Sequence, residues 1–307
     1  MKIFDAHCDV LMKLWMNPNL CFKKDHQLHV TLESLKKTNA KVQLFAIYVS
    51  ESVPYEQRFD AALEMVQLFY TRILSIPQMK LICTKRDIDH LKEGEIGAML
   101  TLEGCDAIGR NIARLQTLLR LGVSSVGLTW NYSNAAADGI LEGRGAGLSS
   151  FGQQVVQINN EAKVWTDVSH LSVKGFWDVM EMADYPIASH SNAYSLCPHP
   201  RNLNDEQIKA LISRNGIMGI TFVPAFLTER NEATVDDVLR HVEYVCKLGG
   251  EHHVGFGSDF DGIVDTTKGL HNYRGYDLLI NQLLKYYSDK QVNNFLYYNF
   301  YRKIPKK

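Results

Sequence analysis

The sequence predicts an α/β fold, namely a (β/α)8 barrel of the TIM type that forms a single domain over residues 1–307. Eight apolar, strand-like runs alternate with amphipathic, helix-like windows, which is typical of parallel β-α units. The length of 307 residues would fit two domains, but it fits equally well one barrel of about 250 residues with longer loops. A doubly wound open sheet is the structural alternative, yet no G-x-G-x-x-G phosphate loop follows an early strand.

The predicted strands are short runs of β-branched or apolar residues, and four of the eight end at a polar residue. They span residues 2–10, 42–49, 98–103, 125–130, 165–170, 186–190, 217–223 and 254–258. Four windows between or after them have helical periodicity: 108–121, 204–216, 237–248 and 276–287. Gly122 follows the first of these windows as a C-cap, and Asn204 caps the second. Residues 131–150 are rich in Gly and Ala and predict a long loop over one end of the barrel.

The composition excludes several classes of protein. The chain has 33 Lys and Arg against 34 Asp and Glu, a formal charge of −1, so it lacks the basic excess of a nucleic-acid or membrane-surface binder. Its six cysteines form no C-x-x-C pair, which favours reduced thiols over a disulfide framework. No secretory signal and no apolar run of bilayer length is evident, so we expect a soluble, cytoplasmic protein with no membrane partner.

Residues of the types that bind metals stand at, or directly after, the ends of five predicted strands: His7, Asp9, Glu103, His170, His190 and Asp259. In a barrel these strand ends open on one face, where the active site is built. Each residue alone has an ordinary interpretation, such as a core histidine or a turn aspartate. Six of them at one rim predict a shared metal site.

Two zinc-like ions suit this set better than one, because a single zinc needs only three protein ligands and a water. The charges agree, since two divalent ions bring +4 and the carboxylates of Asp9, Glu103 and Asp259 bring −3, leaving one charge for a bridging hydroxide. Two such metals lower the pKa of the shared water and polarise a carbonyl oxygen. The set therefore predicts amide hydrolysis without a serine or cysteine nucleophile.

The same residues, in this order, resemble the membrane (renal) dipeptidase family, a peptidase M19-like branch of the metal-dependent amidohydrolase barrels. The matching segments are DAHCD at 5–9, TLEG at 101–104, DVSH at 167–170, SHSNAYS at 189–195 and GFGSDFDG at 255–262. They span nearly the whole chain. His-x-Asp at the first strand, in place of His-x-His, favours this branch over nuclease-like or phosphotriesterase-like relatives.

The resemblance implies a zinc-dependent dipeptidase that hydrolyses small dipeptides through a metal-bridging hydroxide. His7, Asp9 and Glu103 would hold one Zn²⁺, and Glu103, His170 and His190 would hold the other. Glu103 would thus bridge the two ions, where several relatives use a carbamylated lysine. Other divalent ions are the alternative to zinc at both positions.

The resemblance also implies roles for further residues near the metals. Asp259 would move a proton from the bridging water to the leaving amine. Arg201 would bind the substrate's C-terminal carboxylate. Without the resemblance, the sequence around Arg201 would predict only a surface arginine. Mammalian-type members have a histidine that steadies the substrate carbonyl where this chain has Trp130, which offers an indole N–H and a stacking surface. Asn131 or Tyr132 beside it, or the metals alone, would then support that carbonyl.

Two other hypotheses stay open. One is a related dinuclear amidohydrolase that acts on a cyclic amide, a lactone or an N-acyl amino acid. The other is a barrel that binds a ligand without turnover around a structural metal. The expected partner is a small dipeptide, with no nucleic acid and no membrane, and because dimers are common in the resembled family a homodimer is a further expectation.

Overall fold

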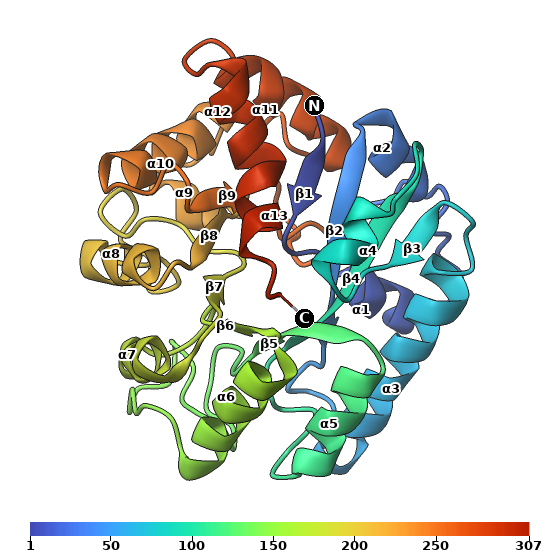
Figure 1. Ribbon diagram of the computed structural model, residues 1–307, viewed down its shortest axis with the longest axis vertical. Coiled ribbons are helices and arrows are strands. Elements are labelled where there is room, and N and C mark those ends of the chain that lie inside the picture. Colours follow the sequence, from blue (N-terminus) through green and yellow to red (C-terminus); the bar gives the residue numbers. More distant parts are fainter. Residues whose placement is uncertain (307) are drawn as a thin grey trace.

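The structure, a computed structural model, describes residues 1–306 and contains a closed ring of eight parallel strands (Figure 1). Around the ring these are β1 (Ile3–Asp5), β2 (Ala40–Tyr48), β4 (Ile96–Glu103), β5 (Val123–Gly127), β6 (Trp165–Asp167), β7 (Pro186–Ala188), β8 (Ile217–Ile220) and β9 (Val254–Phe256). The pairing of β1 with both β2 and β9, and of β2 with β4, closes the ring. The predicted (β/α)8 barrel is confirmed, and the open doubly wound sheet is excluded.

All eight predicted strands form, but most end earlier than predicted. The first leaves the sheet after Asp5, because the Asp5 Oδ1 atom accepts the backbone N–H groups of His7 (3.3 Å) and Ser258 (2.9 Å). Asp167 ends β6 in the same way, since its Oδ1 accepts the N–H groups of Ser169 and Ser189, both at 3.0 Å. In each case a carboxylate replaces the sheet hydrogen bonds, so the following residues curve into the barrel mouth.

One strand was not predicted. The short strand β3 (Met79–Leu81) pairs with the first residues of β4, outside the closed ring. Its three residues are too few to give a clear alternation of apolar and polar side chains.

Helices cover the outside of the ring (Figure 1). They are α1 (Val10–Met16), α2 (Leu32–Lys37), α3 (Arg58–Leu68), α4 (Lys85–Asp89), α5 (Ile112–Arg120), α6 (Ser150–Ala162), α7 (Val173–Met182), α8 (Asp205–Ser213), α9 (Pro224–Leu227), α10 (Val235–Lys247), α11 (Tyr276–Leu283), α12 (Asp289–Asn293) and α13 (Asn299–Lys303). Short 3-10 or π turns lie at Tyr55–Gln57, Phe69–Ile73, Tyr273–Gly275 and Asn294–Tyr298. None of the helices in the described part of the chain combines the length and the apolar character needed to cross a membrane.

The four predicted helices form, as α5, α8, α10 and α11. The first begins later than predicted because the Asn111 side chain accepts the N–H of Ala113 and caps it there. Asn204 caps α8 as predicted, with its side chain accepting the N–H of Gln207.

The C-terminal segment closes the end of the barrel opposite the strand carboxyl ends, and Figure 1 shows it crossing the middle of the ring. Phe300 stacks on Phe4 of β1 with ring centroids 5.2 Å apart. The Trp165 indole, at the start of β6, donates to the backbone oxygen of Lys303 at 3.0 Å. Only the opposite face is therefore left as a mouth.

The predicted loop at 131–150 reaches that mouth. It is held by isolated bridges from Ala137 to Leu148 and from Gly139 to Leu171. Asp138 is buried inside it and pairs with Arg144. The loop is therefore a braced segment whose first residues can be positioned accurately.

Candidate metal centre

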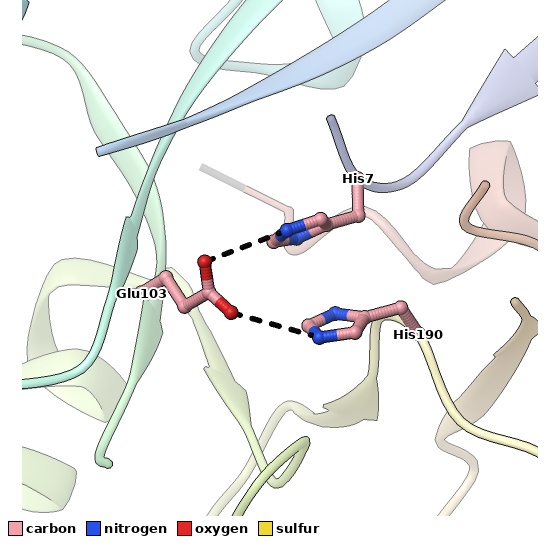
Figure 2. A group of neighbouring side chains, drawn as sticks. All are labelled: His7, Glu103 and His190. Atoms are coloured by element: carbon pink, nitrogen blue, oxygen red, sulfur yellow. Dashed lines mark ion pairs between the residues drawn. The ribbon is translucent and has the colours of Figure 1, made fainter. Parts of the chain in front are cut away.

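Glu103 lies between two groups of histidines at the barrel mouth. Its Oε2 atom is 3.5 Å from the Nε2 of His7, while its Oε1 is 3.0 Å from the Nε2 of His170 and 3.7 Å from that of His190. Figure 2 shows the carboxylate with one oxygen turned toward His7 and the other toward His190. The two oxygens of one carboxylate thus face two different sets of nitrogen donors.

Two carboxylates complete the first set. The Nε2 of His7 is 3.2 Å from Asp9 Oδ2 and 3.8 Å from Asp259 Oδ1. The other oxygen of Asp9, Oδ1, is buried and has no hydrogen-bond partner. An unpartnered buried carboxylate oxygen is costly unless a cation or donor satisfies it, so the residues present fit a bound metal.

The second set consists of the two remaining histidines. Their Nε2 atoms, in His170 and His190, face each other at 2.9 Å. The outer ring nitrogens are held in place: Nδ1 of His170 lies 2.8 Å from Asn131 Oδ1, and Nδ1 of His190 lies 2.8 Å from Ser189 Oγ. Because an amide oxygen can only accept, His170 carries its proton on Nδ1 and presents the lone pair of Nε2 to the centre.

The backbone at the centre is unusual. His170 has φ 68°, Asp259 has φ 63° and Asp261 has φ 69°, which are values in the left-handed region that side-chain-bearing residues adopt rarely. Such residues concentrate at functional sites, where surrounding contacts enforce the conformation. Here the turn at Asp261 is fixed because its carboxylate accepts the N–H groups of His29 (2.8 Å) and Val30 (3.0 Å).

The protonation states of His170 and His190 suit cation binding. Burial lowers the pKa of His170 to about 3 and that of His190 well below its ordinary value, so both imidazoles are neutral at pH 7, the form that binds metals. Burial raises the pKa of Asp259 to about 7, with the nearby charges of Asp9 and Glu103 acting in the same direction. Burial opposes charge on Glu103, yet His7 holds the pKa of this carboxyl well below its usual range.

A cleft of about 350 Å³ opens above these groups. Its walls are formed by Asp9, Met12, Tyr48, Glu103, Trp130, Asn131, His170, Arg201, Val223, Phe226, Asp259, Gly262 and Ile263. His7 and His190 lie beneath it, 3% and 1% exposed. The structure thus brings the proposed ligands, the proton carrier Asp259 and the substrate contacts Arg201, Trp130 and Asn131 to one cleft, whereas Tyr132 is 46% exposed and does not line it.

Arg201 is not a surface arginine. It is 4% exposed, and its Nη2 donates to the backbone oxygen of His190 at 3.2 Å. Its Nε has no partner, and its guanidinium carbon lies 5.5 Å from the ring centroid of Phe226. A buried cation with a free donor in a cleft wall is suited to an anionic ligand group.

Sequence reasoning missed several residues of the cleft: Met12, Tyr48, Val223, Phe226, Gly262 and Ile263. For Tyr48 a signal existed, because it lies one residue before the end of a predicted strand; in the structure it pairs in register with Glu103. The others lie in the loops or short helices that follow the strands, such as Met12 in α1 and Phe226 in α9, and the sequence does not reveal how these segments run. His241 is also buried, with 1% exposed; it accepts the N–H of Ala193 and lies 3.0 Å from the oxygen of Leu227, and it thereby supports the loop after His190.

Comparison with known proteins identifies the family to which the chain belongs. The family described as membrane dipeptidase (peptidase family M19) matches residues 1–306. Dipeptidase aclJ of Aspergillus oryzae is 32% identical over 271 residues, which make up 83% of this chain and 64% of that protein.

Two solved structures share the whole barrel. A metallo peptidase from Rhodobacter sphaeroides, liganded with a phosphinate mimic of the dipeptide L-Ala-D-Ala, has a TM-score of 0.92 at 27% identity. Dipeptidase AC, a metallo peptidase of family M19, has a TM-score of 0.92 at 29% identity. Each alignment covers 99% of this chain and 98% of the other. The family match over the whole described chain and the carboxylate and histidine centre lead to one conclusion: the chain belongs to the membrane dipeptidase family, peptidase family M19, and is a metal-dependent peptide-bond hydrolase.

Proposed function

We propose that this enzyme hydrolyses small dipeptides at a centre of two Zn²⁺ ions. His7, Asp9 and Glu103 would hold one ion, and Glu103, His170 and His190 would hold the other. The observation that carries the proposal is the division of the Glu103 oxygens, with Oε2 toward His7 and Oε1 toward His170 and His190. A carboxylate shared in this way is the arrangement that a bridging ligand needs.

When bound, the two ions would lower the pKa of a water between them and polarise the scissile carbonyl. Asp259 is the proton carrier of the proposal. Its side chain is 15% exposed, its Oδ1 lies 3.8 Å from His7 Nε2, and burial raises its pKa to about 7. A carboxylate at this position can accept a proton from water and return it to the leaving amine within one turnover.

Arg201 binds the C-terminal carboxylate of the substrate in this proposal. Its unpartnered Nε and its burial support the assignment, because a buried guanidinium gains most from a carboxylate that accepts from two of its N–H groups. Asn131 keeps His170 oriented and lines the cleft beside Trp130. The ligand of the Rhodobacter enzyme, a mimic of L-Ala-D-Ala, supports a substrate with a D-residue at its C-terminal side.

The test combines metal content with kinetics. We expect two zinc ions per chain and hydrolysis of dipeptides, with L-Ala-D-Ala cleaved faster than L-Ala-L-Ala. Glu103→Gln should lose at least one metal and about 100-fold or more in kcat/KM, whereas Asp259→Asn should keep both metals and lose turnover. Glu181→Gln, at an exposed position of α7, is the control for removal of a carboxylate.

Each part of the proposal has its own contrary result. One metal per chain at full activity would contradict the dinuclear centre, and full turnover in Asp259→Asn would contradict the proton role. If Arg201→Ala left KM for dipeptides unchanged, the carboxylate contact would be wrong, and a neutral cyclic amide or lactone would become the better substrate. The predicted cytoplasmic location and homodimer stay predictions, open to cell fractionation and analytical ultracentrifugation.

A further inference from the structure

Two aromatic side chains meet in front of the bridging carboxylate. Tyr48 ends β2 directly opposite Glu103 in the sheet register, and Trp130 follows β5 on the other side of β4. The backbone of Trp130 passes so close to Gly104 that a Cβ there would lie 3.1 Å from the Trp130 nitrogen. The rings of Tyr48 and Trp130 have centroids 5.2 Å apart at an interplanar angle of 51°.

This pair forms one wall of the cleft. The Trp130 ring also lies 6.0 Å from that of His170, so the wall continues along the second set of metal-binding nitrogens. Both Tyr48 and Trp130 are half-buried, and Met12 lines the cleft with them. We call Tyr48, Trp130 and Met12 the aromatic wall.

The aromatic wall stands across the mouth from the buried cation. In the closed ring, β4 and β8 are four strands apart, so they lie on opposite sides of an eight-stranded barrel. Tyr48 and Trp130 flank the end of β4, whereas Phe226, against which Arg201 packs, follows β8. The metal centre lies between an apolar side and a cationic side.

The indole N–H of Trp130 is not used to anchor the loop. The indoles of Trp15 and Trp165 donate to Glu64 Oε2 (2.6 Å) and to the Lys303 oxygen (3.0 Å), but within residues 1–306 that of Trp130 has no acceptor. The indole is therefore free to contact a bound ligand, either through its N–H or through the face of its ring. The neighbouring Tyr48 ring and Met12 favour the face, because they extend an apolar surface and not a polar one.

We propose that the aromatic wall is the subsite for the side chain of the substrate's N-terminal residue, and that it selects apolar and aromatic side chains there. The inference rests on the proposed function, in which Arg201 takes the C-terminal carboxylate. An extended dipeptide is about 7 Å long, so a carboxylate held on the Arg201 side directs the N-terminal residue across the metal centre toward Tyr48 and Trp130. A flat ring or branched chain there gains contact with both aromatic faces, whereas glycine gains none.

The experiment measures kcat/KM for dipeptides that differ only at the N-terminal residue: Gly, Ala, Leu and Phe, joined to the C-terminal residue that is turned over fastest. The readout is the ratio of kcat/KM for the Phe substrate to that for the Gly substrate. We expect this ratio to be about 10 or more in the natural enzyme, to fall about ten-fold in Trp130→Ala, and to change less than about three-fold in Trp130→Phe. Trp177→Ala, on the outer helix α7, is the matched control and should leave the ratio unchanged.

The outcomes separate this inference from the proposed function. If the natural enzyme cleaves dipeptides with no preference at the N-terminal residue, the aromatic wall is not a selecting subsite, although the dipeptidase proposal stands. An equal loss for the Gly and Phe substrates in Trp130→Ala would assign the residue a positioning role, and a ratio as low in Trp130→Phe as in Trp130→Ala would assign the effect to the N–H; either result overturns the inference. If no dipeptide is cleaved by the zinc-loaded natural enzyme, the proposed function itself fails.

Discussion

Replacing Gly262 by alanine would place a methyl group against two carboxylates of the metal centre. A Cβ at this position would lie 2.3 Å from Asp9 Oδ2 and 2.6 Å from Asp259 Oδ1, whereas real Cβ atoms keep at least 3.0 Å from such neighbours. The carboxylate of Asp9 must therefore move away by about 0.7 Å, which is the difference between 3.0 Å and 2.3 Å. Gly262 is conformationally ordinary, since its φ is not positive, so the effect comes from the methyl group alone.

We expect Gly262→Ala to lose about 100-fold in kcat/KM, because a displacement near 1 Å at a reacting centre costs roughly that factor. The free energy of unfolding should change by less than about 1 kcal/mol in either direction, since the reduced freedom of the unfolded chain is offset by the cost of displacing two carboxylates. The assay compares dipeptide hydrolysis at saturating zinc, zinc content per chain and urea unfolding of the same preparations.

Gly143→Ala provides the control, since a Cβ there meets no atom within 4 Å and its φ is not positive either. This variant should match the natural enzyme in all three measurements. If Gly262→Ala kept its activity within about two-fold, then Asp9 and Asp259 would tolerate displacement, and the roles proposed for them would not hold.

Three further predictions concern removal of the metal, the hydrogen bond between Asn131 and His170, and the buried imidazole of His241. Chelation should lower Tm, because an ion present at 1,000 times its Kd stabilises the folded state by about 4 kcal/mol, and a calorimetric scan without a shift would contradict the metal-binding assignment. Asn131→Ala removes the partner of His170 Nδ1 at 2.8 Å, so zinc affinity should fall about 10- to 100-fold in a competition titration with a chelator; unchanged affinity would show that Asn131 does not orient the ligand. Burial lowers the pKa of His241 to about 4, below the value near 6.5 of the unfolded chain. The unfolded state therefore binds the extra proton, and stability should fall by about 2 kcal/mol between pH 7 and pH 5, a loss that His241→Gln should remove from urea unfolding curves.

The barrel could be predicted from the sequence because apolar strands and amphipathic helices alternate along the chain, and each of these patterns is local. Eight apolar runs and four helical windows form the predicted kind of element, although most of the strands end earlier than predicted. The strand ends were not accessible, because Asp5 and Asp167 terminate β1 and β6 by accepting N–H groups from Ser258 and Ser189, residues distant in the chain. A carboxylate that ends a strand through a distant residue leaves no local trace.

The candidate site was likewise predictable in part from the sequence. Ligand types at strand ends could be placed on one rim before any coordinates were known, because a parallel barrel brings those ends together. The burial of Arg201 and of His241 could not be predicted, since each depends on how a loop or a helix packs against its neighbours. Tyr48 was overlooked although its strand was correctly predicted, because an aromatic residue in a strand is ordinarily expected to pack in the hydrophobic core.

The left-handed backbone at His170 divides the stability of the metal-free protein from that of the metal-loaded protein. A residue with a side chain costs about 1 kcal/mol at this φ of 68°, so the metal-free protein carries backbone strain at this position. His170→Gly would relieve that strain, but it would also remove a metal-binding nitrogen and with it stabilisation that the bound metal supplies. A heat-resistance screen of a random library therefore keeps this histidine only if metal is present during the screen.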